Sequence, residues 1–112
     1  MATGTVQIPF DRTGMTEVHS WTYGKCYLQV DKRLKLAWIA YVGNDASISG
    51  RQNTHFNLSQ YCMPSVTVEM IPNGVSGGQV SIYKNTSGVA DGEVYIYQNT
   101  KYFSMFACFP IE

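Results

Sequence analysis

The sequence has few charged residues. Asp, Glu, Lys and Arg make up 14% of its 112 residues, against roughly 25% in ordinary soluble domains. Basic and acidic residues number eight each, so the formal net charge is zero. No cluster of basic residues supplies the positive surface that binding to nucleic-acid phosphates requires. We therefore expect no nucleic-acid partner.

Long apolar runs are also missing. No segment approaches the roughly 20 apolar residues that are needed to cross a bilayer. The first four residues, Met-Ala-Thr-Gly, do not have the basic region followed by an apolar region that is typical of a secretory signal. We therefore expect no membrane insertion and no export signal.

Residues that carry reactive or metal chemistry are scarce. Cys26, Cys62 and Cys108 are far apart, odd in number and set among apolar residues, which favours buried small hydrophobic side chains over a disulfide framework. His19 and His55 are the only histidines, and neither lies in a neighbourhood typical of a nucleophile with its base and orienting carboxylate. Closely spaced metal ligands are absent as well. We expect no catalysis, no metal and no cofactor.

Signals for β-strands recur through most of the chain, as alternating β-branched and aromatic residues separated by Gly, Asn, Asp and Ser. The first two predicted strands form a hairpin around Gly24, and the third is a central strand. Two later segments share the pattern Gly-polar-Val-x-Ile-Tyr, which predicts antiparallel neighbours. The predicted strands span 18–23, 25–30, 34–42, 66–71, 78–83, 92–97 and 102–109.

Many short strands at this spacing predict an antiparallel β-sandwich, of jelly-roll type, with residues 1–112 as a single domain. The last strand, 102–109, carries Phe106 and Cys108 on one face and Met105 and Phe109 on the other. Because both faces are apolar, this strand is expected either to be central or to pack against another subunit. The second alternative indicates an oligomer.

The segment 43–57 is polar and long for a connection in a compact domain. Loops of this kind often carry function, and a tyrosine ring can stack against a sugar. The same pattern equally fits a solvated loop with tyrosines in the core, and Asn44 and Asp45 can be turn formers. Trp21 and Trp38 are expected in the core or an interface. The candidate ligand-binding residues are Tyr41, Asn44, Asp45, Arg51, Gln52, Asn53, His55 and Tyr61.

The second half of the chain also has a recognisable layout. A segment ending at Pro64 is followed by a strand, a hairpin that begins at Gly78 and an aromatic final strand. This order resembles the C-terminal receptor-binding domains of phage and prophage tail fibre and baseplate proteins. Residues 1–57 carry no pattern of that family, and 1–15 would be a junction to an upstream shaft.

The resemblance implies a non-catalytic homotrimeric β-domain that binds a saccharide or protein on the bacterial surface for host recognition. It further implies association with other phage tail proteins, synthesis in the host cytoplasm and a place in the virion tail, where the domain acts outside the cell. Two alternatives remain. A structural trimerisation or capping module would form a trimer without a ligand, and a carbohydrate-binding module would bind sugar as a monomer.

Overall fold

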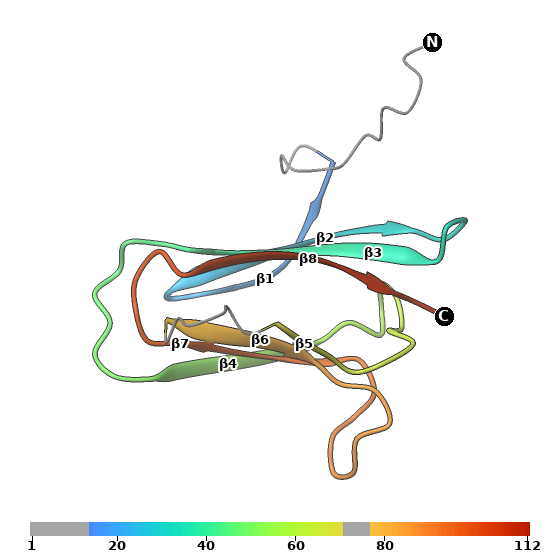
Figure 1. Cartoon of the computed structure of the whole chain (residues 1–112). Helices are drawn as coiled ribbons and strands as arrows, with labels where there is room; N and C mark the ends of the chain where they lie inside the picture. The colour runs from blue at the N-terminus through green and yellow to red at the C-terminus, as the bar shows by residue number, and fades with distance from the viewer. Residues whose placement is uncertain (1–13, 71–76) are drawn as a thin grey trace.

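The computed structural model describes residues 14–70 and 77–112. They form eight strands and no helix, arranged as two antiparallel sheets that face each other (Figure 1). Sheet A has the order β1-β2-β3-β8 and sheet B the order β4-β7-β6-β5, which confirms the predicted all-β sandwich. The strands are β1 (Thr16–Trp21), β2 (Gly24–Asp31), β3 (Leu36–Gly43), β4 (Gln52–Asn57), β5 (Val68–Met70), β6 (Gly78–Ile82), β7 (Glu93–Gln98) and β8 (Ser104–Pro110).

Several local predictions are confirmed. Strands β1 and β2 form the hairpin expected around Gly24, and β3 lies between β2 and β8 as a central strand. Strands β6 and β7 are antiparallel neighbours. Residues 1–13 of the predicted junction and residue 71 of the predicted strand 66–71 lie outside the described residues. Strand β4, in contrast, occupies half of the segment that we expected to be a loop.

The strand pairing follows one long hairpin that folds over on itself. The chain runs through β3, β4 and β5, and returns through β6, β7 and β8, so that β5 pairs with β6, β4 with β7 and β3 with β8. It crosses between the sheets at 44–51 and again at 99–103. As a result β8 is an edge strand of sheet A, so the first of the two alternatives for its apolar faces, a central position, is wrong. Only one of its faces points into the core.

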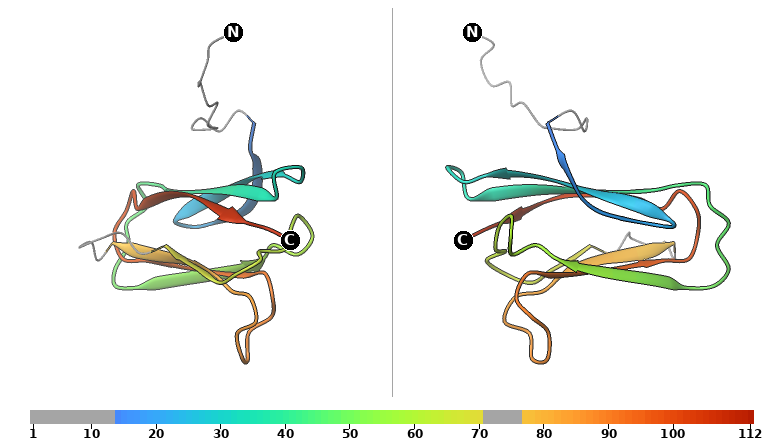
Figure 2. Two further views of the ribbon diagram at one scale, coloured as in Figure 1. Left: turned by 45° about the vertical axis from the view of Figure 1, so that its right-hand side comes forward. Right: turned by 180° about the vertical axis from the view of Figure 1, so that it is seen from behind.

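The two sheets form two layers (Figure 2). Both sheets contribute side chains to the core between them. Cys26 is fully buried there, and burial raises the pKa of its thiol to about 12. It is therefore a small core hydrophobe, as predicted. Cys108, however, is exposed on the outward side of β8, where the sequence led us to expect burial. The buried hydrophobic residues include Leu28, Ile39, Tyr41, Leu58, Val80, Ile82, Val94, Ile96 and Phe109.

A buried hydrogen-bond chain connects the two sheets. The indole N–H of Trp21 donates to the Tyr41 hydroxyl at 2.7 Å, and this hydroxyl donates to Oε1 of Gln98 at 2.5 Å. Gln98, which is fully buried, donates in turn to the carbonyl of Thr100 at 3.0 Å. Burial raises the pKa of Tyr41 to about 12. These hydrogen bonds satisfy polar groups whose burial without a partner would cost free energy.

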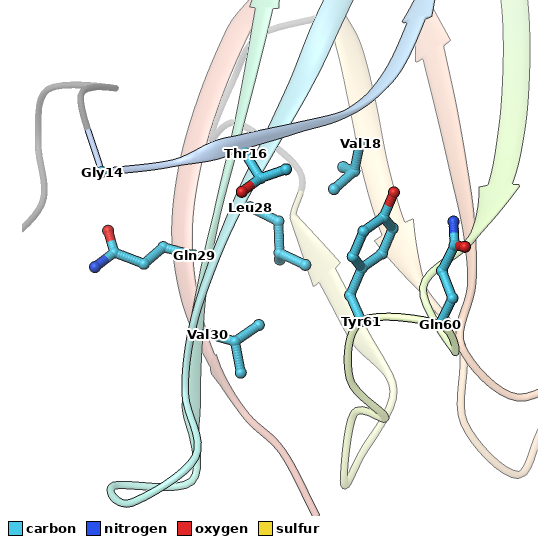
Figure 3. Close-up of a pocket in the computed structure, with 8 residues that line it drawn as sticks. All are labelled: Gly14, Thr16, Val18, Leu28, Gln29, Val30, Gln60 and Tyr61. Carbon is cyan, nitrogen blue, oxygen red and sulfur yellow. The ribbon is translucent and has the colours of Figure 1, made fainter.

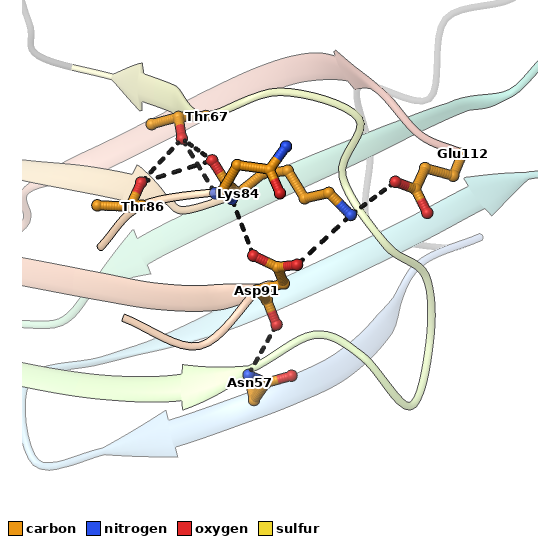
Figure 4. Close-up of polar contacts among 7 residues, drawn as sticks. Asn57, Thr67, Lys84, Thr86, Asp91 and Glu112 are labelled. Carbon is orange, nitrogen blue, oxygen red and sulfur yellow. Dashed lines mark hydrogen bonds and ion pairs between the residues drawn. The ribbon is translucent and has the colours of Figure 1, made fainter. Parts of the chain in front are cut away.

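Ion pairs and hydrogen bonds stabilise the start of the long β6–β7 connection (Figure 4). The ammonium of Lys84 lies 2.6 Å from a carboxylate oxygen of Glu112 and 3.6 Å from one of Asp91. The Thr67 hydroxyl donates to the Lys84 carbonyl at 2.9 Å and accepts from the Lys84 amide at 3.0 Å. The hydrogen bond to Glu112 is the main reason that the pKa of Lys84 is raised. This cluster joins sheet B to the segment that follows β8, which is a structural role.

Candidate functional site

The outward side of sheet B gathers tyrosines and neutral polar side chains. Side chains of a strand alternate between its two faces, so the residues next to the buried Val94 and Ile96 point outward. Directly opposed residues share a face: Asn53 and Gln79 flank Tyr97. The tyrosine face, as we name this surface, comprises Arg51, Asn53, His55, Asn57, Gln79, Ser81, Glu93, Tyr95 and Tyr97.

Each of the two tyrosine rings on the tyrosine face contacts a nitrogen-containing side chain. The Arg51 guanidinium carbon lies 3.6 Å from the centre of the Tyr97 ring. The His55 ring stacks on Tyr95 with 5.4 Å between centroids and 23° between planes. A cation over an exposed aromatic ring contributes roughly 0.5–1 kcal/mol. These contacts hold Arg51 and His55 in defined positions although both are exposed.

The carboxylate of Glu93 organises the neighbouring part of this face. One of its oxygens accepts a hydrogen bond from Nδ1 of His55 at 2.7 Å, and the other accepts from Nδ2 of Asn57 at 3.0 Å. Tyr83 meets the Tyr95 ring edge-on at 5.5 Å. With amide groups and aromatic carbon side by side, the face can hydrogen-bond hydroxyl groups and pack against C–H surfaces.

The structure brings three of the predicted site residues together. Asn53 and His55 are alternate outward residues of β4, and Arg51, which directly precedes β4, reaches the same face over the Tyr97 ring. Gln52 falls between them and points inward, opposite the buried Gln98, with its amide donating to the Ser49 carbonyl at 3.2 Å. The alternation of a strand, which we had not predicted here, therefore separates Gln52 from its neighbours.

Tyr41 was wrongly placed among the ligand-binding residues. Its ring is 1% exposed and offers no free face to a ligand. Asn44 is occupied by structural contacts: its amide donates to the Thr22 carbonyl at 3.0 Å, and its side-chain oxygen accepts from the Ala46 amide at 2.9 Å. Asn44 is thus the turn former that the alternative interpretation described. Asp45 is exposed on the 44–51 crossover.

Tyr61 lines a separate pocket of about 480 Å³ (Figure 3). It points into the same space as Val18, Leu28 and Val30, whereas Gln29 points to the other side of β2. The lining contains no charged side chain; it consists of Gly14, Thr16, Val18, Leu28, Gln29, Val30, Gln60 and Tyr61. The pocket volume suits a small ligand. It is, however, lined by none of the residues of the tyrosine face, so the eight predicted residues do not form one site.

Sequence reasoning missed Tyr95 and Tyr97. The pattern Glu-Val-Tyr-Ile-Tyr at 93–97 does place both tyrosines on one face of a strand. It does not reveal that the opposite strand is β4, because β4 has few of the β-branched and aromatic residues that mark a strand. Pairing with β4 sets His55 opposite Tyr95 and Asn53 opposite Tyr97.

The outward side of sheet A is different. Phe106 and Tyr27 flank Ala40 in one row, and Cys108 lies beside Trp38 in the next. Phe106 is 38% exposed. We name this surface the apolar face; it comprises Tyr27, Trp38, Ala40, Val42, Phe106 and Cys108.

In the described part of the chain, no helix is long and apolar enough to cross a membrane. The same residues contain no group of three or more His, Cys, Asp or Glu side chains that could hold a metal ion. Comparison of the chain with protein-family models, with curated proteins and with solved structures finds no match.

Proposed function

We propose that this chain is a non-catalytic saccharide-binding domain whose tyrosine face contacts a glycan on the bacterial surface. The observation that carries the proposal is the pair Tyr95 and Tyr97, adjacent outward residues of one strand, with Asn53 and His55 opposite them. Sugars present C–H surfaces that pack on aromatic rings and hydroxyl groups that bond amides and imidazole. A flat sheet face suits an extended glycan chain.

The setting of Glu93 favours binding over catalysis. Both of its oxygens already accept hydrogen bonds, from His55 and Asn57. These hydrogen bonds fix the orientation of the His55 and Asn57 side chains, which suits a binding surface. We therefore assign Glu93 the role of positioning His55 on the face.

The biological setting of the proposal is the tip of a phage tail, where the domain would recognise the host together with other tail proteins. The resemblance in residues 58–112 supports it, and the return of β6–β8 along β3–β5 supports a jelly-roll arrangement. The apolar face supports assembly of several copies, which the resemblance makes a homotrimer. Several copies would raise the avidity of weak single sites.

The proposal is tested by measuring binding of the full chain to an array of bacterial surface glycans. Tyr95→Ala and Tyr97→Ala should each weaken binding about tenfold or more. The matched control is Tyr102→Ala, because Tyr102 is 64% exposed and belongs to the 99–103 crossover, not to a strand of sheet B. Loss of binding in Tyr61→Ala alone would move the ligand to the pocket, and absence of binding to every glycan would contradict the proposal.

Light scattering after size exclusion separates the alternatives. A trimer that binds glycans fits the tail-tip proposal, whereas a trimer without a ligand fits the capping module. A monomer that binds glycans fits the free carbohydrate-binding module. Phe106→Asp, on the apolar face, should lower the measured mass, while Val66→Asp, another exposed hydrophobic position at 51%, should not.

A further inference from the structure

Arg51 carries a positive charge that no carboxylate of the described residues neutralises. The ion pairs among residues 14–70 and 77–112 involve Lys25, His55 and Lys84 as the cations, and Arg51 is in none of them. The negative charge on the same face, that of Glu93, is met by His55 and Asn57. The tyrosine face therefore has an unpaired cation at the Arg51 end.

Other acidic groups on sheet B lie too far away to compensate. Glu69 points outward from β5, opposite Ser81, and β5 is separated from β4 by two strands. Three strand spacings amount to about 14 Å, which exceeds the screening length of about 8 Å at physiological salt. Glu69 is therefore too far away to offset the charge of Arg51.

The position of Arg51 is set by a contact that leaves its donors available. Its guanidinium lies over the Tyr97 ring at 3.6 Å, so the ring uses the face of the planar group and not its N–H edge. That edge carries five donors in a fork that matches a carboxylate with two parallel hydrogen bonds. Asn53, directly opposite Tyr97, adds an amide to the same end of the face.

We propose that the glycan bound by the tyrosine face is acidic, and that Arg51 binds the carboxylate of one of its sugar residues. This inference rests on the proposed function and names the class of its ligand. The sugar that carries the carboxylate lies beside Tyr97 and Asn53. The neighbouring sugar packs toward Tyr95 and His55.

The test uses bacterial polysaccharides that contain uronic acid, each compared with its carboxyl-reduced form, in which the same backbone is neutral. The wild-type chain should bind the reduced form about tenfold more weakly. Arg51→Gln should weaken binding to the acidic form by a similar factor, so that this variant binds the acidic and the reduced form with about equal affinity. Arg51→Lys keeps the charge without the fork and should fall between the two.

The matched control is Arg33→Gln, which removes the same charge from an exposed position between β2 and β3 of sheet A. It should bind both forms like the wild type. Raising salt from about 0.05 to 0.5 M should weaken wild-type binding to the acidic form and change Arg51→Gln little. Circular dichroism and urea unfolding show whether each variant is folded.

Two results would overturn the inference while saccharide binding stands: equal affinity of the wild type for the acidic and reduced forms, or equal weakening by Arg51→Gln and Arg33→Gln. Binding to neutral glycans but to no acidic glycan, with a dependence on Tyr95, also overturns the inference while saccharide binding stands. If neither form nor any other glycan binds, the proposed function fails together with the inference.

Discussion

The outward sides of the two sheets are built on the same strand alternation but carry opposite chemistry. On sheet B the outward positions of β4 and β7 hold Asn53, His55, Tyr95 and Tyr97. On sheet A the outward positions of β3 and β8 hold Trp38, Val42, Phe106 and Cys108 with one hydroxyl, that of Ser104, and Phe106 is 38% exposed. A polar aromatic surface is stable in water, whereas an apolar one favours a partner. This difference is the basis of our proposal that sheet B binds the ligand and that sheet A mediates assembly.

The two faces depend on a common interior. Tyr41 from sheet A and Gln98 from sheet B share a hydrogen bond, and side chains of both sheets form a single core. A change in the interior should therefore affect both faces through stability. A change on one face should leave the other intact.

The largest effect is expected for Gly24→Ala. A Cβ at this position would lie 2.4 Å from the Tyr41 hydroxyl and 2.7 Å from the Val42 carbonyl oxygen, so the hairpin or the interior must shift. We expect a loss of about 3 kcal/mol of unfolding free energy, measured in urea. Gly88→Ala, with open space around a φ of 82°, should cost only about 1–2 kcal/mol. Equal losses would contradict the role of the Tyr41 contact.

The second-largest effect is expected for Tyr41→Phe. It removes the hydroxyl that connects the Trp21 indole to the Gln98 amide and leaves two polar groups without that partner. We expect a loss of about 2 kcal/mol of unfolding free energy. Glycan binding by the folded variant should be unchanged, because Tyr41 is buried. A large drop in affinity without a loss of stability would restore Tyr41 to the binding site.

The pair Tyr95→Ala and Phe106→Asp tests the division between the two faces directly. Tyr95→Ala should lower glycan affinity about tenfold and leave the molecular mass unchanged. Phe106→Asp should lower the mass and leave the affinity of a single site unchanged, with unfolding free energy within about 0.5 kcal/mol of the wild type. Affinity is measured by calorimetry and mass by light scattering. If either variant altered both properties, the two faces would not be independent.

The smallest effect concerns His19, which joins the sheets at the β1 edge. Its Nε2 lies 2.8 Å from the Thr54 hydroxyl and its ring stacks on Phe56. Burial, with a smaller contribution from His55, lowers the pKa of His19 below 6.5. Its contribution to stability is therefore complete above pH 6.5 and is lost as the pH falls through 6.5 toward the folded-state pKa.

Urea unfolding between about pH 7.5 and 5 should show this decrease in the wild type. His19→Gln should make the unfolding free energy less dependent on pH in the same range. A wild-type stability that rises as the pH is lowered through this range would contradict the direction of the pKa shift.

The sequence by itself determined the local structure. The alternation in 25–30, 34–42 and 92–97 predicted the strands β2, β3 and β7, because side chains of a strand reach its two faces in turn. Gly24 predicted the first hairpin, because a turn also depends on residues that are adjacent in the chain. The sequence also picked out the segment 43–57, which carries Arg51 and His55.

Only the tertiary structure decided which predicted residues form a surface together. Arg51 meets Tyr97, and His55 meets Tyr95, because β4 pairs with β7, and such pairing between distant segments has no local signal in their residues. Burial of Tyr41 likewise follows from the packing of sheet A on sheet B. The spacing of residues in the sequence shows which residues are neighbours along the chain. Burial and charge pairing depend on residues from distant segments that pack together in the fold.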